Sequence, residues 1–286
     1  MKKLLFFIVL LFCGIAFGVE WPQDEYDDKA IVSYFGQNVS GRISTSIVFR
    51  DPAEVKAVKD GKILIIMSDF NDDSEFFPST LGSSVILCHD DDLISVYSNL
   101  DTDSINEMTA DKDTVKEGEI IGTTGNSGWQ NQRSSLEFQL IDNLKSTAIN
   151  PKILLPRTEN EVDYSLTGIM LQNKEGKLFD LRESKNFQSG QYKIYQTRNK
   201  IAVPYKTTIT INGVLIDEIS FDTVGQENGK LYVIGKKKYN AEDLYPDDTL
   251  LLLGEAMLTP GRSTLGLSTF NFLGKTKQLN YVLSIY

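Results

Sequence analysis

Short apolar runs separated by turn residues dominate this 286-residue sequence beyond Ile63. Each run is rich in Ile, Val, Leu, Tyr or Phe and is bounded by Gly, Asp, Asn or Ser, which is typical of β-strands and their turns. No amphipathic helix of ordinary length stands out among them. The sequence therefore predicts an all-β, antiparallel fold. In the first half of the chain the predicted strands lie at 62–67, 83–89, 93–100, 119–125 and 135–141.

A polar stretch, RTENEVD at 157–163, is predicted to link two β-rich domains at 19–156 and 164–286. The clearest feature of the second domain is TTITINGVLIDEISF at 207–221, where two alternating strands flank Asn212-Gly213. This dipeptide favours a two-residue type I′ hairpin, because both of its positions need positive φ. Further strands at similar spacing predict an immunoglobulin-like β-sandwich for this domain.

The first 18 residues have the layout of a secretory signal peptide. A basic start precedes an apolar run at 4–13, and small residues flank Phe17 just before the expected cleavage after Gly18. The apolar run is shorter than the roughly 20 residues that a membrane-spanning helix needs. We therefore expect an exported, periplasmic protein that begins at Val19 and has no transmembrane segment.

The two cysteines of the sequence bear on the same question. An alternative to cleavage after Gly18 is a lipoprotein with Cys13 as the lipidated residue, although Phe12 is large where a small residue is usual. Without the leader, Cys88 is the remaining cysteine, so no internal disulfide is expected. Its position in an apolar run predicts a small core residue.

The charge of the chain restricts its partners. Removal of residues 1–18 takes away Lys2 and Lys3, so 27 of the 29 basic residues remain beside 39 acidic ones and the formal net charge becomes −12. Nucleic-acid binding needs a basic face, so no nucleic-acid partner is expected. Broad adhesion to anionic polymers or lipid surfaces is disfavoured for the same reason, although a local basic patch is compatible with this balance.

Five motifs in the first domain occur in a recognisable order. They are GRISTSIVFRDPAEVKAVKDGKI (41–63), VILCHDDDLISVYSNL (85–100), VKEGEIIGTTGNSG (115–128), SSLEFQL (134–140) and NP (150–151). Together they resemble the lysostaphin/LytM family of zinc peptidases, which cut peptide bonds in bacterial peptidoglycan. The resemblance spans about 35–156 and implies the LytM-type antiparallel β domain, a duplicated hybrid motif.

The resemblance also indicates where the zinc ligands and catalytic histidines of the family would lie. At these positions the sequence has other residue types. The three zinc ligands of the family fall at Ser44, Val48 and Glu137, and its two further catalytic histidines fall at Asn99 and Ser135. Catalytic zinc needs about three strong protein ligands, whereas valine has no lone pair and a neutral hydroxyl binds zinc poorly. We therefore expect a degenerate member with no catalytic residues, no metal and no cofactor.

The single histidine, His89, stands beside Asp90, Asp91 and Asp92 and could suggest a relocated metal site. Adjacent strand residues point in opposite directions, so these carboxylates cannot all converge on one ion. The spaced aspartates of a calcium loop are also missing. The segment is therefore expected to be a solvated turn. A Ser-His or Cys-His pair could form only through His89, and Cys88 and His89 are strand neighbours that face opposite ways.

The resemblance implies a non-catalytic LytM-like protein of the cell envelope, which binds peptidoglycan peptide or regulates a cell-wall hydrolase such as an amidase. One alternative is an active metallopeptidase with a rebuilt metal site. Another is a structural or adhesive protein that works through the immunoglobulin-like domain. The predicted binding groove is lined by Ser44, Asn99, Trp129, Arg133, Ser135 and Glu137.

Overall fold

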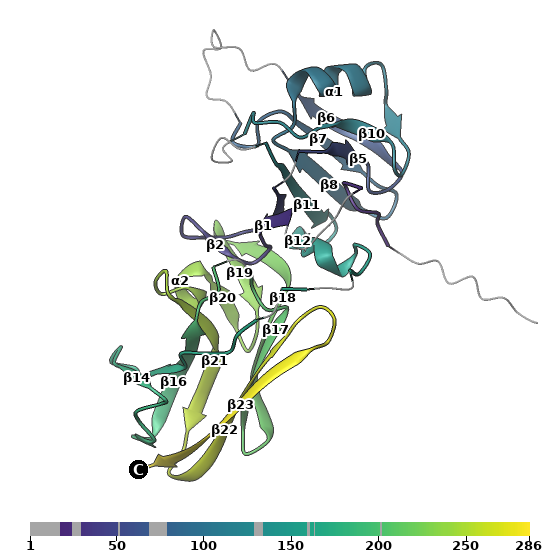
Figure 1. The fold of residues 1–286 in the computed structure, drawn as a ribbon. Helices are drawn as coiled ribbons and strands as arrows, with labels where there is room; N and C mark the ends of the chain where they lie inside the picture. The colour runs from purple at the N-terminus through teal and green to yellow at the C-terminus, as the bar shows by residue number, and fades with distance from the viewer. Residues whose placement is uncertain are drawn as a thin grey trace, which may run out of the picture.

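The computed structural model describes residues 18–24, 30–50, 52–68, 79–128, 134–158, 161–162, 164–200 and 202–286. They form two β-rich lobes, the first from residue 18 to 158 and the second from residue 161 to 286 (Figure 1). The predicted all-β class is confirmed, because strands make up most of the described secondary structure. The predicted leader lies outside these residues except for Gly18. In the described part of the chain, no helix is long and apolar enough to cross a membrane.

The first lobe is built around one antiparallel sheet in the order β12-β11-β8-β7-β6-β9. Strand β4 also pairs with β11, and β1 pairs with β4. A smaller β5–β10 sheet and the β2–β3 hairpin complete the lobe. Its strands are β1 (Ile31–Ser33), β2 (Asn38–Val39), β3 (Arg42–Ile43), β4 (Ile47–Phe49), β5 (Glu54–Lys56), β6 (Gly61–Met67), β7 (Ser84–Cys88), β8 (Leu93–Ser98), β9 (Thr114–Val115), β10 (Ile120–Thr123), β11 (Leu136–Asp142) and β12 (Thr147–Ile149).

Strand β11 shows how the sequence orients the residues of interest. Leu136, Phe138 and Leu140 are fully buried, whereas Glu137 and Gln139 between them are half-buried. Successive side chains of a strand point to opposite faces, so the apolar set faces the core and Glu137 faces away from it. The buried face therefore determines which side of the sheet carries the candidate site.

Two features of the first lobe differ from the expectations. Helix α1 (Thr102–Thr109) follows β8 and was not predicted, because eight residues with one fully buried apolar side chain give little helical periodicity. It begins where the Asp101 side chain accepts a hydrogen bond from Ser104 N, an N-cap that stabilises a first turn. Cys88 is half-buried rather than a core residue, because it lies at the end of β7.

The second lobe consists of two sheets that share one hydrophobic core. One sheet has the order β14-β13-β16-β21, and the other contains β15-β23-β22-β17-β18 with β19 and β20. The immunoglobulin-like topology of this lobe remains a prediction. Its strands are β13 (Met170–Gln172), β14 (Leu178–Asp180), β15 (Asn186–Phe187), β16 (Gly190–Thr197), β17 (Lys206–Ile211), β18 (Val214–Glu227), β19 (Lys230–Ile234), β20 (Lys238–Asn240), β21 (Leu250–Leu258), β22 (Gly261–Phe270) and β23 (Thr276–Ile285), and helix α2 (Ala241–Leu244) follows β20.

The predicted Asn-Gly hairpin is present in the second lobe. Strands β17 and β18 pair up to Ile211 and Val214, which leaves Asn212 and Gly213 as the two turn residues. Their φ values are 51° and 82°, the positive values that a type I′ turn requires.

The two lobes are joined by strand pairing and by side-chain contacts. Strand β12 of the first lobe pairs with β18 of the second, so the main sheet continues from one lobe into the other. The Tyr245 hydroxyl donates to Gly36 O at 2.6 Å, and one core cluster includes residues of both lobes. Gly36 has a φ of +85°, and a Cβ there would lie 2.8 Å from Phe221 of the second lobe, so this contact needs glycine.

A buried ion pair adds to the junction. Lys152 Nζ lies 2.9 Å from Glu161 Oε1, and the two side chains are only 8% and 3% exposed. The other carboxylate oxygen of Glu161 accepts a hydrogen bond from Phe272 N, and Lys152 Nζ lies over the Phe272 ring at 5.3 Å. Lys152 of the first lobe and Glu161 and Phe272 of the second therefore meet at one buried cluster.

Candidate functional site

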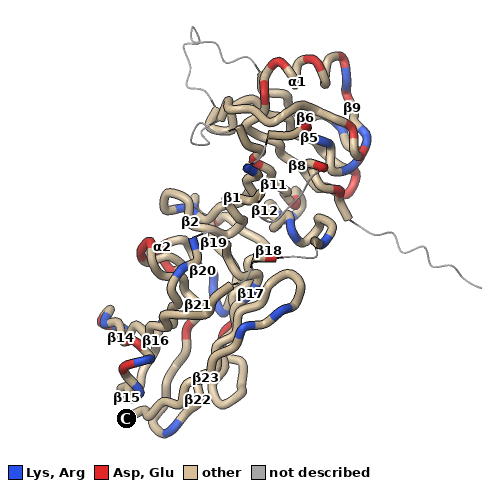
Figure 2. Tube along the Cα trace, viewed as in Figure 1, with Lys and Arg blue, Asp and Glu red and all other residues tan. Residues whose placement is uncertain are grey.

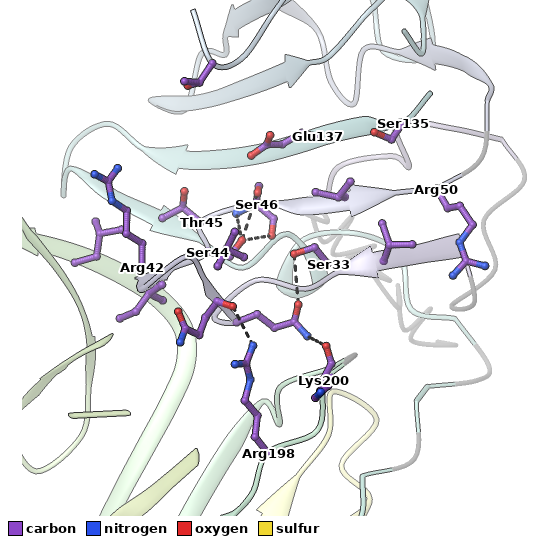
Figure 3. Close-up of a pocket in the computed structure, with 18 residues that line it drawn as sticks. Ser33, Arg42, Ser44, Thr45, Ser46, Arg50, Ser135, Glu137, Arg198 and Lys200 are labelled. Atoms are coloured by element: carbon purple, nitrogen blue, oxygen red, sulfur yellow. Dashed lines mark hydrogen bonds between the residues drawn. The ribbon is translucent and has the colours of Figure 1, made fainter. Parts of the chain in front are cut away.

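A pocket of about 710 Å³ lies against the junction of the lobes. Its floor is formed by β1, β4 and β11, and its opposite wall by the β2–β3 hairpin and the segment after β16 (Figure 3). Its lining combines apolar, hydroxyl-bearing and cationic side chains. The described lining residues are Val32, Ser33, Gln37, Asn38, Val39, Arg42, Ile43, Ser44, Thr45, Ser46, Val48, Arg50, Thr80, Ser135, Glu137, Arg198, Lys200 and Leu231.

Four of the predicted site residues line this pocket: Ser44, Val48, Ser135 and Glu137. Val48 and Glu137 are cross-strand partners in the β4–β11 pairing, which explains their proximity. Ser44 precedes β4, and its hydroxyl contacts Ser46, with Ser44 Oγ 3.2 Å from Ser46 O. The structure thus brings together the three positions at which the resemblance expects zinc ligands.

Asn99, the fifth position, does not line the pocket. Its side chain is fully buried, and its backbone has a φ of 64°. The amide Nδ2 donates to Gly125 O at 3.0 Å and to Ser135 O at 2.8 Å, and Oδ1 accepts from Gly128 N at 2.8 Å. Asn99 therefore ties together the ends of three segments below the pocket, where it is not available to a ligand.

The remaining two predicted groove residues, Trp129 and Arg133, lie outside the described residues. Their neighbour Ser135 is almost completely buried, and its Oγ accepts a hydrogen bond from Asn99 Nδ2 at 3.0 Å. Ser135 thus forms part of the pocket wall together with the Asn99 network beneath it.

The residues at the expected zinc position do not fit zinc. Val48 offers no donor atom, Ser44 offers a neutral hydroxyl, and Glu137 offers one carboxylate. A zinc site needs a set of strong N, S or carboxylate ligands in tetrahedral geometry. In the described ranges, no group of three or more His, Cys, Asp or Glu side chains is placed so as to hold a metal ion. No zinc-dependent step can therefore be derived from this donor set.

The single histidine is held within the first lobe, away from this pocket. His89 is 3% exposed, its Nδ1 lies 2.7 Å from Asp60 O, and its Nε2 lies 2.8 Å from Ser95 Oγ. A carbonyl can only accept, so Nδ1 carries the proton and Nε2 accepts from the serine hydroxyl. Asp90, Asp91 and Asp92 are exposed beside it. The aspartates are solvated as expected, whereas His89 is not part of a solvated turn: it is buried and bridges two segments.

Burial lowers the pKa of His89 below its ordinary value of 6.5, and the hydrogen bond to Asp60 O and the charges of Asp91 and Asp90 only partly oppose this shift. A histidine with a depressed pKa stabilises the fold fully above its unfolded pKa, and the stabilisation decreases as the pH falls below it. We expect His89→Gln to lower the free energy of unfolding by about 1–3 kcal/mol at pH 7.5, through lost hydrogen bonds. The difference from the parent protein should shrink at pH 5.5 in urea titrations, and a constant or growing difference would contradict this interpretation.

The four cationic side chains that line the pocket were not among the residues predicted for the groove. Arg42 and Arg50 flank the segment that contains Ser44 and Val48, so their positions were visible in the sequence. Arg198 and Lys200 belong to the second lobe, and no local pattern connects them with the first-lobe motifs. Their placement depends on contacts across the junction: Arg198 Nη2 donates to Asn38 O at 2.9 Å, across 160 residues of sequence.

Comparison with known proteins bears on the first lobe. The family model described as Peptidase family M23 matches residues 43–151, and a second family model matches residues 163–286. Among curated proteins, no relative matches the chain.

Among solved structures, a zinc-containing peptidase from Vibrio cholerae is 23% identical with a TM-score of 0.31, covering 40% of this chain and 33% of that one. This chain thus spans about a third of that structure. The catalytic domain of a mutant of the prophage-encoded M23 protein EnpA from Enterococcus faecalis is 22% identical with a TM-score of 0.34, covering 46% and 95%. A SpoIIIAH and SpoIIQ complex matches at 23% identity and a TM-score of 0.31, covering 46% and 88%.

The residues matched by the M23 model include β4, β11 and all five positions at which the family places its zinc ligands and catalytic histidines. Four of these positions line the pocket, and the fifth, Asn99, is fully buried and bonds to the lining residue Ser135. Residues 43–151 of the chain therefore match the model of Peptidase family M23.

Proposed function

We propose that this chain is an exported, non-catalytic relative of the M23 peptidases, whose pocket binds peptidoglycan peptide or contacts a cell-wall hydrolase. One observation carries the proposal. The pocket at the family's zinc position persists as an open space of about 710 Å³, but its walls hold Ser44, Val48 and Glu137 in place of a ligand set. Hydrolysis of an amide needs an activated water and groups that transfer protons near neutral pH.

The pocket residues supply neither requirement. The only imidazole of the chain is His89, which is buried between Asp60 and Ser95 and is not among the pocket residues. The hydroxyl-bearing and apolar side chains that remain can still contact the amides and aliphatic groups of a peptide. Binding without cleavage is therefore the activity that this pocket supports best.

The proposal is tested with purified protein and isolated peptidoglycan, with and without added zinc. We expect the protein to co-sediment with peptidoglycan and to release no soluble peptide fragments, while an active M23 peptidase run in parallel does release them. Zinc-dependent release by the purified protein would overturn the non-catalytic assignment. If the protein does not co-sediment but stimulates a cell-wall amidase, contact with a hydrolase is favoured over peptide binding.

Export is tested separately. Protein recovered from outside the cytoplasm is expected to begin at Val19, which N-terminal sequencing would show. A lipid on Cys13 would instead support the lipoprotein alternative, and an intact leader on protein confined to the cytoplasm would contradict export.

A further inference from the structure

The pocket is cationic in a chain that is acidic overall. Arg42, Arg50, Arg198 and Lys200 line it, and Glu137 is the single acidic side chain among its described lining residues. The whole chain carries a formal net charge of −10, and Figure 2 shows acidic residues on both lobes, including α1 and α2. Like charges gathered in one cleft repel each other and raise the local concentration of oppositely charged ligands.

These four cations form no ion pairs with carboxylates of the described residues. Within the described ranges, none of them lies within 4.0 Å of a carboxylate oxygen, whereas lysines elsewhere pair with aspartate or glutamate on both lobes. Two of the four belong to a segment that is fixed in position. The Arg198 guanidinium lies over the Tyr245 ring at 5.1 Å, and Gln37 Nε2 donates to Lys200 O at 3.0 Å. The junction thus holds positive charge without a carboxylate partner at the pocket wall.

The arrangement of the charges indicates the shape of the ligand. In Figure 3, Arg42 and Arg50 lie at opposite ends of the pocket, and Arg198 and Lys200 approach from the second lobe between them. A single small anion cannot contact both ends at once. The charges therefore fit an extended ligand that carries more than one anionic group.

The surface between the charges favours a peptide over a phosphate polymer. Val48, Val32 and Leu231 supply apolar contact, and hydroxyl groups of serine and threonine lie among them. Such a mixture suits aliphatic side chains and backbone amides, which a polyphosphate does not have. Arginine also forms bidentate hydrogen bonds with carboxylates, so it suits an acidic peptide.

We propose that this pocket binds an extended acidic peptide, whose carboxylates are contacted by Arg42 and Arg50 of the first lobe and by Arg198 and Lys200 of the second. This inference rests on the proposed function as a peptide-binding protein and adds the charge class of the ligand. It also assigns the second lobe a direct part in binding. The two lobes together form the site, and neither supplies all four cations.

The test uses the full chain and two fluorescent peptides that differ only in charge, Ala-Glu-Ala-Ala-Glu-Ala and Ala-Gln-Ala-Ala-Gln-Ala. We expect measurable binding of the first peptide and at least tenfold weaker binding of the second, with affinity falling as salt rises. Arg42→Gln, Arg50→Gln and Lys200→Gln should each weaken binding about threefold to tenfold, because each removes one charge-assisted contact. The first two affect the first lobe, whereas Lys200→Gln tests the contribution of the second.

Lys174→Gln is the matched control, because it removes the same charge from an exposed turn of the second lobe that is not part of the pocket. It should change the affinity by less than about twofold, and unfolding midpoints of all variants should match the parent protein. Equal binding of the two peptides, equal effects of Lys174→Gln and Lys200→Gln, or preference for polyphosphate over the acidic peptide would overturn the inference.

Peptidoglycan co-sedimentation of the same variants separates this inference from the proposed function. The three pocket variants could still co-sediment with peptidoglycan while the protein shows no selectivity for the acidic peptide. That result would leave the proposed function standing and overturn the charge assignment. Selective binding of the acidic peptide without co-sedimentation would support the charge assignment and contradict the peptidoglycan ligand.

Discussion

Replacing Lys152 with methionine is expected to lower the free energy of unfolding by about 3–5 kcal/mol, the range for breaking a buried ion pair. Methionine is apolar and of similar length, but it removes the charge that lies over the Phe272 ring. Glu161, which is 3% exposed, then retains its hydrogen bond from Phe272 N without the cation that compensates its burial. Urea titration followed by circular dichroism measures the loss.

Two variants make this prediction specific. Lys152→Met combined with Glu161→Gln should recover a large part of the stability, because neither side chain then buries a charge. Lys116→Met breaks the pair with Asp60, whose side chains are 80% and 58% exposed, and should lower the free energy of unfolding far less, because solvent screens an exposed pair. A comparable loss for Lys152→Met and Lys116→Met would show that burial of the junction pair has no energetic consequence.

Asn99→Ala is the second substitution with a large expected effect, about 3–5 kcal/mol of unfolding free energy. It removes the donors to Gly125 O and Ser135 O and the acceptor for Gly128 N, which leaves buried backbone groups without these partners. The φ of 64° adds a smaller cost, because alanine adopts the left-handed region less readily than asparagine.

Asn228→Ala measures the cost of placing alanine at a positive φ without the loss of the hydrogen bonds that Asn99 makes. Asn228 has a φ of 51° in an exposed turn of the second lobe, so its substitution should cost about 1 kcal/mol, and thermal or urea unfolding should rank it well below Asn99→Ala. Equal losses at the two positions would mean that the hydrogen bonds beneath the pocket contribute little to stability.

The sequence predicted the strands that carry the site, because their side-chain pattern reflects burial. In β11 the alternation of Leu136, Glu137 and Phe138 identifies the core face and the pocket face without reference to any other segment. The hairpin at Asn212-Gly213 was predictable for a similar reason, since the turn depends on two adjacent residues. Motif order then placed Ser44, Val48 and Glu137 in one region, and the strand pairing confirms the proximity of Val48 and Glu137.

The sequence could not show what depends on distant contacts or on backbone conformation. Asn99 occupies the position of a family histidine, but its left-handed φ and its bonds to Gly125, Gly128 and Ser135 hold the side chain below the pocket. Arg198 reaches the pocket only because the second lobe packs against Asn38 and Gly36. Helix α1 was not predicted, because a single N-cap indicates a helix less strongly than a periodic apolar face does.

The pairing of β12 with β18 has a consequence for the order in which the chain is made. The partner residues of Ala148 and Ile149 in β18 are Val224 and Thr223, so roughly 75 further residues must be synthesised before they are available. Until then the first lobe presents β12 as an open strand edge, and such edges pair readily with other chains. Pairing with β18 covers this edge, so a first lobe made without the second is expected to misassemble more readily than the full chain.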